Sequence, residues 1–259
     1  MQRVPYDNSE TPGTETNAEG NTLFEPEPVV ATNDFKGTPG QAELAIQVRR
    51  LIDLTARSRL SSHQYDTLMA TIRVAVDTVE DPLRAGLVQH GSTAEEMALV
   101  NSKATNLPPE RDPLDYVPLS PVMGICNPLA PPVKASIHSN GEITGTVWLG
   151  TAYQGPPGCV HGGIIAAIFD ELLGLANFAA GSPAMTGTLN IRYRKPTPLW
   201  HTLELMASIK EKGSRKTIAV GQISYNGELT AEAEGIFITL SQEKLNALSA
   251  RATTTSRRQ

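Results

Sequence analysis

The sequence contains few cysteines, few aromatic residues and no excess of positive charge. Only two of its 259 residues are cysteines, so a disulfide framework is excluded and a reducing compartment is expected. The net charge is −5, so the chain lacks the excess of basic residues that binding to nucleic-acid phosphates requires. Aromatic residues make up 5% of the chain, whereas hydrophobic residues make up 40%, which is enough to fill a core. The composition therefore favours a soluble globular protein without a nucleic-acid partner.

Signals for targeting and for common cofactors are also missing. The first ten residues contain no continuous apolar segment, and seven acidic residues among the first forty disfavour a transit peptide. No phosphate-binding loop, dinucleotide fingerprint or Gly-x-Ser-x-Gly motif occurs. Cys159 and His161 lack the number and spacing of ligands that zinc requires. We therefore expect a cytoplasmic protein with no metal and no other cofactor.

Changes in composition divide the chain into five segments. Residues 1–40 are rich in Thr, Glu, Pro, Asn and Gly and are predicted to form a disordered tail. Residues 41–104 form a predicted helical extension, and residues 105–131 form a proline-rich linker. The main domain is expected over residues 132–242, and a C-terminal tail over residues 243–259.

The helical extension is predicted to contain three amphipathic helices. Apolar residues recur at helical spacing over 41–57 and again over about 62–79, where Asp81-Pro82 is expected to close the second helix. A shorter helix is expected over 95–103. Because their polar faces carry mixed charge, these helices are expected to pack on the main domain rather than on a membrane.

Two kinds of periodicity alternate in the main domain. Alternating apolar residues predict strands, and Asn-Gly dipeptides at 140–141 and 226–227 predict tight hairpins. One long helix is expected over 162–179. The expected strands cover 133–138, 143–149, 185–195, 202–211, 216–225 and 229–240. This order predicts an α+β fold in which an antiparallel sheet wraps around one helix.

The long helix carries the features that point to chemistry. It begins at Gly162-Gly163, directly after His161, so its first backbone N–H groups are uncovered and can hold negative charge on an oxygen. The helix is apolar on nearly every face and is expected to be buried, yet it carries Asp170 and Glu171. Burial without a partner charge raises the pKa of a carboxyl group. Singly, each feature suits an ordinary turn or a solvated acid; together they favour a functional site. Two acids among about 18 residues, with strands on either side, argue against a membrane span.

Three features of this region resemble a known family. The run His161-Gly162-Gly163, the acid at Asp170 and the threonine at Thr186 resemble the hotdog-fold acyl-CoA thioesterases, in their PaaI-like branch. The resemblance covers roughly residues 133–240. It implies the hotdog fold, an acyl-CoA substrate and a place in lipid metabolism. It also implies that Asp170 is the general base or nucleophile, that Gly162 supplies the oxyanion N–H, and that His161 and Thr186 position thioester and water. Gly163 is expected to line the substrate site.

The spacing along the helix predicts a homodimer. Gly162 and Asp170 lie eight residues apart, which corresponds to about 12 Å along the helix axis. A base and an oxyanion donor must approach one carbonyl group to about 3 Å. We therefore expect Asp170 to meet Gly162 of a second copy, with the two helices antiparallel across a two-fold axis. A dimer, or a dimer of dimers, with two equivalent sites is expected.

Other polar residues have weaker claims to a role. Glu171 lies about 100° around the helix from Asp170 and is expected to face solvent or to form a hydrogen bond. Asn177 is either a core amide or a substrate ligand, and Cys159 is a less favoured nucleophile. The basic residues near the end of the following strand either bind CoA phosphates or are solvated: Arg192, Arg194 and Lys195. The same ambiguity applies to Lys212, Arg215 and Lys216.

Two rival functions remain open at this stage. A hotdog hydratase or dehydratase also binds acyl thioesters, but it needs a histidine–acid pair at a spacing that nothing here matches. A non-catalytic acyl-CoA-binding or scaffold protein would use the long helix as a dimer core and leave its acid inert. Thioester hydrolysis explains the whole set of residues and is the favoured interpretation.

Overall fold

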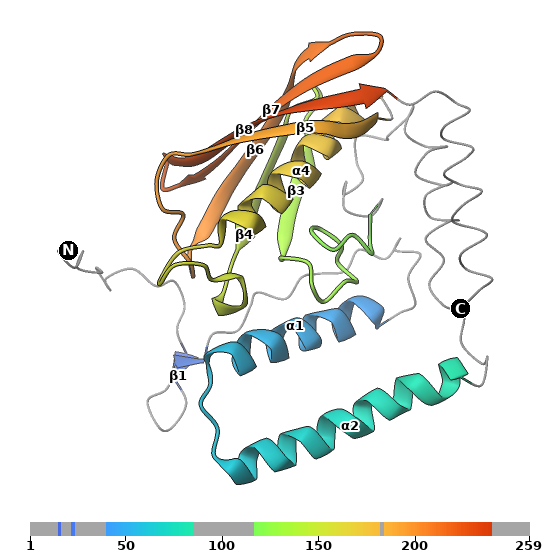
Figure 1. Ribbon diagram of the computed structural model, residues 1–259, viewed down its shortest axis with the longest axis vertical. Helices are drawn as coiled ribbons and strands as arrows, with labels where there is room; N and C mark the ends of the chain where they lie inside the picture. The colour runs from blue at the N-terminus through green and yellow to red at the C-terminus, as the bar shows by residue number, and fades with distance from the viewer. Residues whose placement is uncertain (1–14, 17–21, 24–39, 85–116, 182–183, 240–259) are drawn as a thin grey trace, which may run out of the picture. The chain divides into compact units, whose positions relative to one another are not determined.

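The computed structural model describes residues 15–16, 22–23, 40–84, 117–181 and 184–239 (Figure 1). The chain divides into two units, residues 1–36 and residues 37–259. In the first unit, β1 (Glu15–Thr16) pairs antiparallel with β2 (Thr22–Leu23). The rest of the predicted disordered tail, the helix expected over 95–103 and the C-terminal tail lie outside the described residues.

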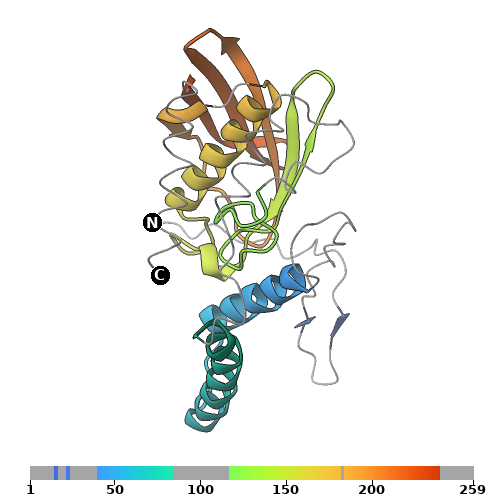
Figure 2. The same ribbon diagram turned by 90° about the vertical axis from the view of Figure 1, so that its right-hand side faces the viewer.

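The second unit is built on one antiparallel sheet of six strands in the order β3-β4-β6-β7-β8-β5. A single long helix, α4 (Gly162–Ala179), lies along one face of this sheet (Figures 1 and 2). The expected sheet around one helix is therefore confirmed. The strands are β3 (Val133–Ile137), β4 (Ile143–Trp148), β5 (Ala184–Tyr193), β6 (Thr202–Lys212), β7 (Lys216–Tyr225) and β8 (Glu228–Thr239).

Strand ends agree with the sequence because turn chemistry fixes them. Asn226 and Gly227 both have positive φ angles, 50° and 72°, which a two-residue turn between β7 and β8 requires. Gly141 has φ 82° in the turn between β3 and β4. Asparagine and glycine adopt this conformation at low cost, so both predicted hairpins form where expected.

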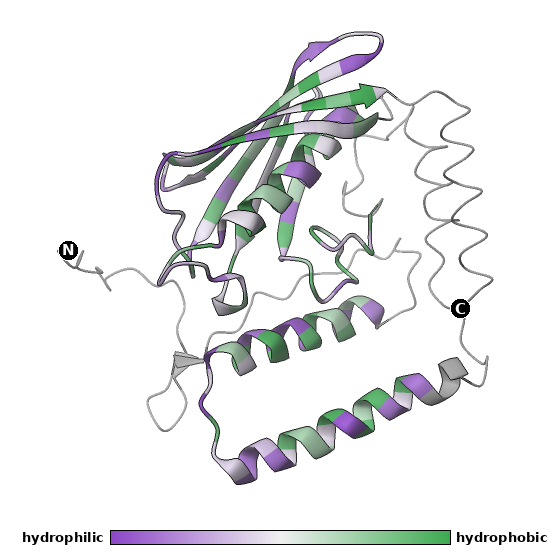
Figure 3. Ribbon diagram, in the orientation of Figure 1, coloured by the Kyte–Doolittle hydropathy of each residue, from purple (hydrophilic) through white to green (hydrophobic). Residues whose placement is uncertain are grey.

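The core lies between α4 and the sheet. Figure 3 shows hydrophobic and hydrophilic residues alternating along the strands, as expected for a sheet with one covered face. Glycines on the sheet allow the helix to come close: a Cβ at Gly221 or at Gly235 would lie 3.0 Å from a Cδ atom of Leu173. The helix contributes a set of buried apolar side chains: Ile165, Ile168, Phe169, Leu172, Leu173, Leu175 and Ala176.

The expectation that α4 is buried on nearly every face is wrong for the single chain. The sheet covers one side, and the segment 117–131 covers part of another, where Met123 joins the core and Ser120 reaches Glu171. Asp170 is exposed. One sheet cannot surround a helix, so the remaining side stays open. Among the described helices α4 alone has the length and hydropathy of a membrane span, a test that core helices of soluble proteins also pass.

The helical extension begins with α1 (Gln41–Arg57) and α2 (Ser62–Arg84). Both helices lie where apolar spacing predicts them. The expected end of α2 at Asp81-Pro82 is wrong, because the helix continues to Arg84. A proline removes only one N–H donor, and here the chain keeps its helical path for the last residues of α2.

Candidate active site

The start of α4 forms a small cluster of directed hydrogen-bonding groups. His161 caps the helix in an extended conformation, with φ −64° and ψ 133°. Its side-chain Nδ1 accepts a hydrogen bond from the N–H of Gly163 at 2.9 Å, and its carbonyl oxygen accepts from Ile164 at 2.9 Å. In the part of the chain that the structure describes, the N–H of Gly162 has no acceptor. This donor is therefore left for a ligand at the positive end of the helix.

The histidine cap also fixes which ring nitrogen carries the proton. Because Nδ1 of His161 accepts from Gly163, we assign the proton of the neutral ring to Nε2. The side chain of His161 is exposed. A second N–H donor is therefore available near the free N–H of Gly162.

Tyr193, which sequence reasoning missed, holds the same turn from the sheet. Its hydroxyl donates to the carbonyl oxygen of Gly162 at 2.9 Å. A Cβ at Gly162 would lie 3.4 Å from this hydroxyl, so the contact is close. In β5, Tyr193 lies on the face opposite Arg192. Nothing in the sequence indicated that the opposite face meets the start of α4.

Backbone hydrogen bonds within the segment 153–161 fix the loop that leads into His161. The N–H of His161 donates to the carbonyl oxygen of Tyr153 at 2.9 Å, and Gly155 donates to Cys159 at 2.9 Å. A Cβ at Gly155 would lie 2.8 Å from Cα of His161, so only glycine fits there. The turn 153–161 therefore presents His161 from a fixed loop.

A bulge in β5 turns Thr186 toward the helix side of the sheet. Thr188 pairs with Ile236, whereas Thr186 pairs with Phe237, so Gly187 is an extra residue in β5. Phe237 belongs to the core beneath α4. Paired residues share a face, so Thr186 faces the α4 side and Thr188 the opposite side. Without the bulge, both threonines would face away from the helix.

Asp170 lies in the middle of α4. Gly174 is one turn further along and shares the helix face of Asp170. A Cβ at Gly174 would lie 4.0 Å from Cε1 of Phe237, the residue opposite Thr186. Asp170 is exposed in the single chain. Thr186 is exposed as well.

The neighbouring acid, Glu171, has a different environment. It is half-buried, and its carboxylate forms a hydrogen bond with the side chain of Ser120. Burial raises the pKa of Glu171, the bond to Ser120 lowers it, and the nearby Asp170 raises it further. Of the two alternatives for Glu171, the structure selects the hydrogen-bonded one. The sequence did not reveal the partner, because Ser120 lies in the proline-rich segment.

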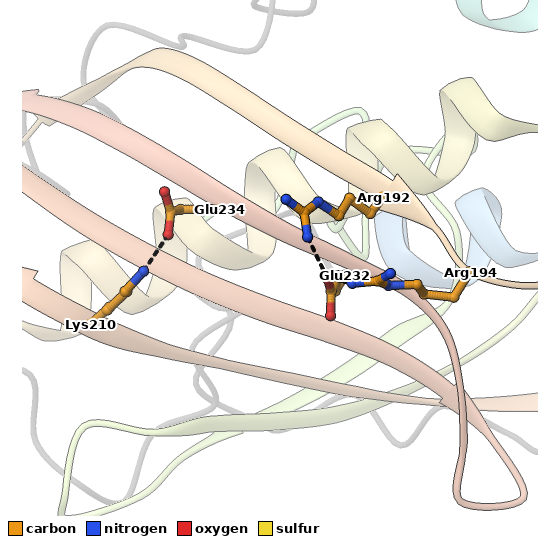
Figure 4. Close-up of polar contacts among 5 residues, drawn as sticks. All are labelled: Arg192, Arg194, Lys210, Glu232 and Glu234. Atoms are coloured by element: carbon orange, nitrogen blue, oxygen red, sulfur yellow. Dashed lines mark hydrogen bonds and ion pairs between the residues drawn. The ribbon is translucent and has the colours of Figure 1, made fainter.

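The basic residues near the end of β5 are engaged in ion pairs (Figure 4). Arg194 pairs with Glu232, and Arg192 lies 3.9 Å from the same carboxylate. Arg192 and Glu232 are opposite each other on the face of the sheet away from α4. Lys195 pairs with Glu228. A role for Arg192, Arg194 and Lys195 in binding CoA phosphates stays a prediction, but Arg192 and Arg194 do not join the cluster at His161.

The remaining candidates, Asn177 and Cys159, differ in their burial. Asn177 is only 2% exposed and lies among the core residues of α4, which suits a core amide. Cys159 is partly exposed in the turn before His161. Among the described residues, no group of three or more metal-ligating side chains lies close enough together to hold an ion.

The fold and this cluster can now be compared with known proteins. Residues 157–229 match the family model of the thioesterase superfamily. The acyl-coenzyme A thioesterase THEM4 of Mus musculus is 39% identical over 97 residues, which cover 37% of this chain and 42% of that protein. The acyl-coenzyme A thioesterase THEM5 of Homo sapiens is 31% identical over 98 residues, 37% of this chain and 39% of that protein. A crystal structure of a thioesterase superfamily protein aligns with TM-score 0.61 at 28% identity, over 79% of this chain and 96% of the other.

Together, these observations define an α+β domain of the hotdog class. Over residues 157–229 the domain is similar to the thioesterase superfamily, and the resemblance to the hotdog-fold acyl-CoA thioesterases is confirmed. The matches cover less than half of the length of the curated relatives. The assignment to the PaaI-like branch stays a prediction.

Proposed function

We propose that this protein hydrolyses acyl-CoA thioesters to a free acid and CoA, and that it does so in the cytoplasm. The observation that carries the proposal is the free N–H of Gly162 at the start of α4, flanked by His161 and held by Tyr193. The names of the curated relatives, acyl-coenzyme A thioesterases, support the same reaction.

In this proposal, the thioester carbonyl oxygen accepts a hydrogen bond from the N–H of Gly162. The Nε2–H of His161 is a second donor beside it. Both hydrogen bonds become stronger as negative charge develops on the oxygen, and the dipole of α4 adds to this stabilisation. Because the His161 cap and the Tyr193 hydroxyl fix the turn before substrate arrives, little reorganisation is needed.

Asp170 completes the reaction in one of two ways. As a general base, it takes a proton from water while the water oxygen bonds to the carbonyl carbon; the C–S bond then breaks and the CoA sulfur receives the proton. As a nucleophile, its carboxylate forms an anhydride and releases CoA thiolate, and water then cleaves the anhydride. In either route, Thr186, which the bulge turns to the α4 side of the sheet, holds the water.

The site requires two copies of the chain. Gly162 and Asp170 are separated by about 12 Å along α4, which is too far for both to act on one carbonyl group. Asp170 is exposed, and β5 is an edge strand with Met185 and Tyr193 each 54% exposed. An open edge strand with exposed apolar side chains favours pairing with another chain. We propose a two-fold dimer in which Asp170 of one copy faces Gly162 of the other.

A panel of acyl-CoA esters with detection of the released thiol tests the reaction. We expect turnover by the wild type and a loss of at least about a hundredfold in Asp170→Asn, the range that a catalytic acid–base group contributes. The neighbouring variant Glu171→Gln is the matched control and should retain most activity. Circular dichroism establishes that both variants are folded.

Other outcomes of this panel favour the rival functions. Tight binding of CoA esters without thiol release would identify a binding or scaffold protein. Loss of an enoyl-CoA chromophore without thiol release would identify a hydratase. Full activity of a folded Asp170→Asn protein would contradict the proposed role of the acid.

A further inference from the structure

Helix α1 of the helical extension contacts the segment 117–131 through Arg49. Arg49 on α1 donates from Nε to the carbonyl oxygen of Ala130 at 2.7 Å and from Nη2 to that of Asn127 at 3.0 Å. Burial lowers the pKa of Arg49. A half-buried guanidinium with two carbonyl partners docks α1 on the main domain.

One turn further along α1, Asp53 reaches the backbone of the main domain. Its Oδ1 accepts a hydrogen bond from the N–H of Thr151 at 2.9 Å, and its Oδ2 lies 3.2 Å from Nε of Arg57. The side chain of Asp53 is 20% exposed, so the carboxylate is partly shielded from water. Thr151 is the first residue of the short helix η2 (Thr151–Tyr153). The carboxylate therefore holds the first N–H of η2.

The backbone at this contact is shaped to admit the carboxylate. A Cβ at Gly150 would lie 2.4 Å from Oδ1 of Asp53, so every other residue would displace the side chain. The φ of Gly150 is −91°, which any residue can adopt. Close approach of Asp53, rather than an unusual backbone conformation, therefore requires glycine at this position.

The end of η2 is in turn hydrogen-bonded to His161, the residue that caps α4. Tyr153, at the end of η2, accepts the hydrogen bond from the N–H of His161 at 2.9 Å. Burial raises the pKa of Tyr153, Arg49 opposes this and Asp53 adds to it, because the three side chains lie close together. His161 in turn accepts from Gly163. Two hydrogen bonds, joined by the backbone of η2, thus link Asp53 to the residue that caps α4.

We propose that Asp53 is a positioning residue for thioester hydrolysis. By holding η2 it fixes the carbonyl oxygen of Tyr153, which orients His161 and, through it, the free N–H of Gly162. The extension would then set the geometry of the oxyanion site without touching substrate. This proposal rests on the proposed function, because positioning acts on turnover only if Gly162 receives the thioester oxygen.

Three variants test the proposal in the full-length protein. Asp53→Ala removes the acceptor, Asp53→Asn keeps an oxygen at the position of Oδ1, and Arg57→Ala removes the exposed partner of the same carboxylate. We expect Asp53→Ala to lower kcat about tenfold with KM within twofold, as for loss of one charged hydrogen bond acting on the transition state. Asp53→Asn should restore most of kcat, and Arg57→Ala should match the wild type.

A fourth variant perturbs the same contact from the other side. Gly150→Ala places a methyl group where Oδ1 of Asp53 lies and should reproduce the loss in kcat. An unchanged kcat in Asp53→Ala would overturn the proposal. Equal losses in Asp53→Ala, Asp53→Asn and Arg57→Ala would overturn it too, because they would indicate general loosening of α1.

Amide hydrogen exchange separates this proposal from the proposed function. The N–H of His161 and of Gly163 should exchange at least about tenfold faster in Asp53→Ala than in the wild type. This measurement needs no substrate. If the wild type hydrolyses no acyl-CoA, the proposed function fails, while faster exchange still supports positioning by Asp53. Unchanged exchange at both amides would overturn the positioning role whatever the activity.

Discussion

The hydroxyl of Tyr193 donates to the carbonyl oxygen of Gly162 at 2.9 Å and so joins the edge strand β5 to the first turn of α4. The bond lies on the same peptide segment as the proposed oxyanion donor. Because β5 is also the strand proposed to meet a second copy, one tyrosine connects the proposed dimer edge with the first turn of α4.

Removing the Tyr193 hydroxyl should slow the reaction without unfolding the domain. Tyr193→Phe keeps the ring and loses one hydrogen bond worth about 1 kcal/mol, which predicts a fall in kcat of about fivefold. Steady-state kinetics with a short acyl-CoA measures it. Tyr225→Phe, which loses a bond to His201 elsewhere in the domain, is the control. Equal effects of both variants would argue against a specific role for Tyr193.

The bulge at Gly187 predicts opposite results for two nearby threonines. Thr186→Val removes a hydroxyl on the α4 side and should lower kcat about tenfold, as expected for a group that holds the reacting water. Thr188→Val makes the same chemical change on the opposite face and should leave kcat within twofold of the wild type. The same acyl-CoA assay compares the two variants. Reversed effects would mean that the register shift does not set the site.

The N–H of Gly162, the proposed oxyanion donor, can be removed with little change to the backbone. Proline is well accepted at the first position of a helix, and His161, with ψ 133°, already has the conformation that a residue before proline adopts. Gly162→Pro should therefore fold and lose at least about a hundredfold in kcat. Gly162→Ala keeps the N–H and adds a methyl group 3.4 Å from the Tyr193 hydroxyl, so it should remain active.

Mixing two inactive variants tests whether the site is shared between chains. If Asp170 of one copy serves Gly162 of the other, heterodimers of Asp170→Asn and Gly162→Pro contain one intact site. Random exchange of equal amounts should then restore about one quarter of wild-type activity. A site within one chain would restore none. Analytical ultracentrifugation of the wild type should show a dimer or a larger even assembly.

Glu171 should make stability depend on pH. Its pKa is raised in the folded protein, mainly by burial, so ionisation of Glu171 disfavours folding. Below the pKa of the unfolded chain this cost is absent. The cost grows as the pH rises from the unfolded to the folded pKa, by about 1.4 kcal/mol for each pH unit between them. Above the folded pKa the cost is constant. Glu171→Gln should therefore gain free energy of unfolding relative to the wild type at about pH 8 but not at about pH 4.

Urea unfolding at the two pH values measures this difference. Glu43→Gln, which removes an exposed acid on α1, controls for the change in net charge. A difference between Glu171→Gln and the wild type that is the same at both pH values would contradict the proposed burial cost.

Local patterns made much of the fold predictable. Alternation located each strand of the six-stranded sheet to within a few residues, and the Asn-Gly turns fixed two hairpins. The run His161-Gly162-Gly163 located the start of α4. The second helix ran beyond its expected end, because one proline near a helix terminus does not suffice to stop it.

Interactions between distant segments were not predictable in the same way. Tyr193 follows Gly162 by 31 residues, and Asp53 precedes Thr151 by 98 residues. No local pattern encodes such pairs, because each arises only when separate elements pack. The bulge at Gly187 is equally hidden, since one extra residue reverses which face of β5 Thr186 occupies.

The sequence by itself therefore determined the elements, their order and the residue types at the start of α4, because these follow from local periodicity and turn chemistry. Only the tertiary structure decided which acid is exposed and which is half-buried, which threonine faces the helix, and which distant residues contact the start of α4. Those choices depend on which surfaces meet, and side-chain spacing along one segment carries no information about the surface that will cover it.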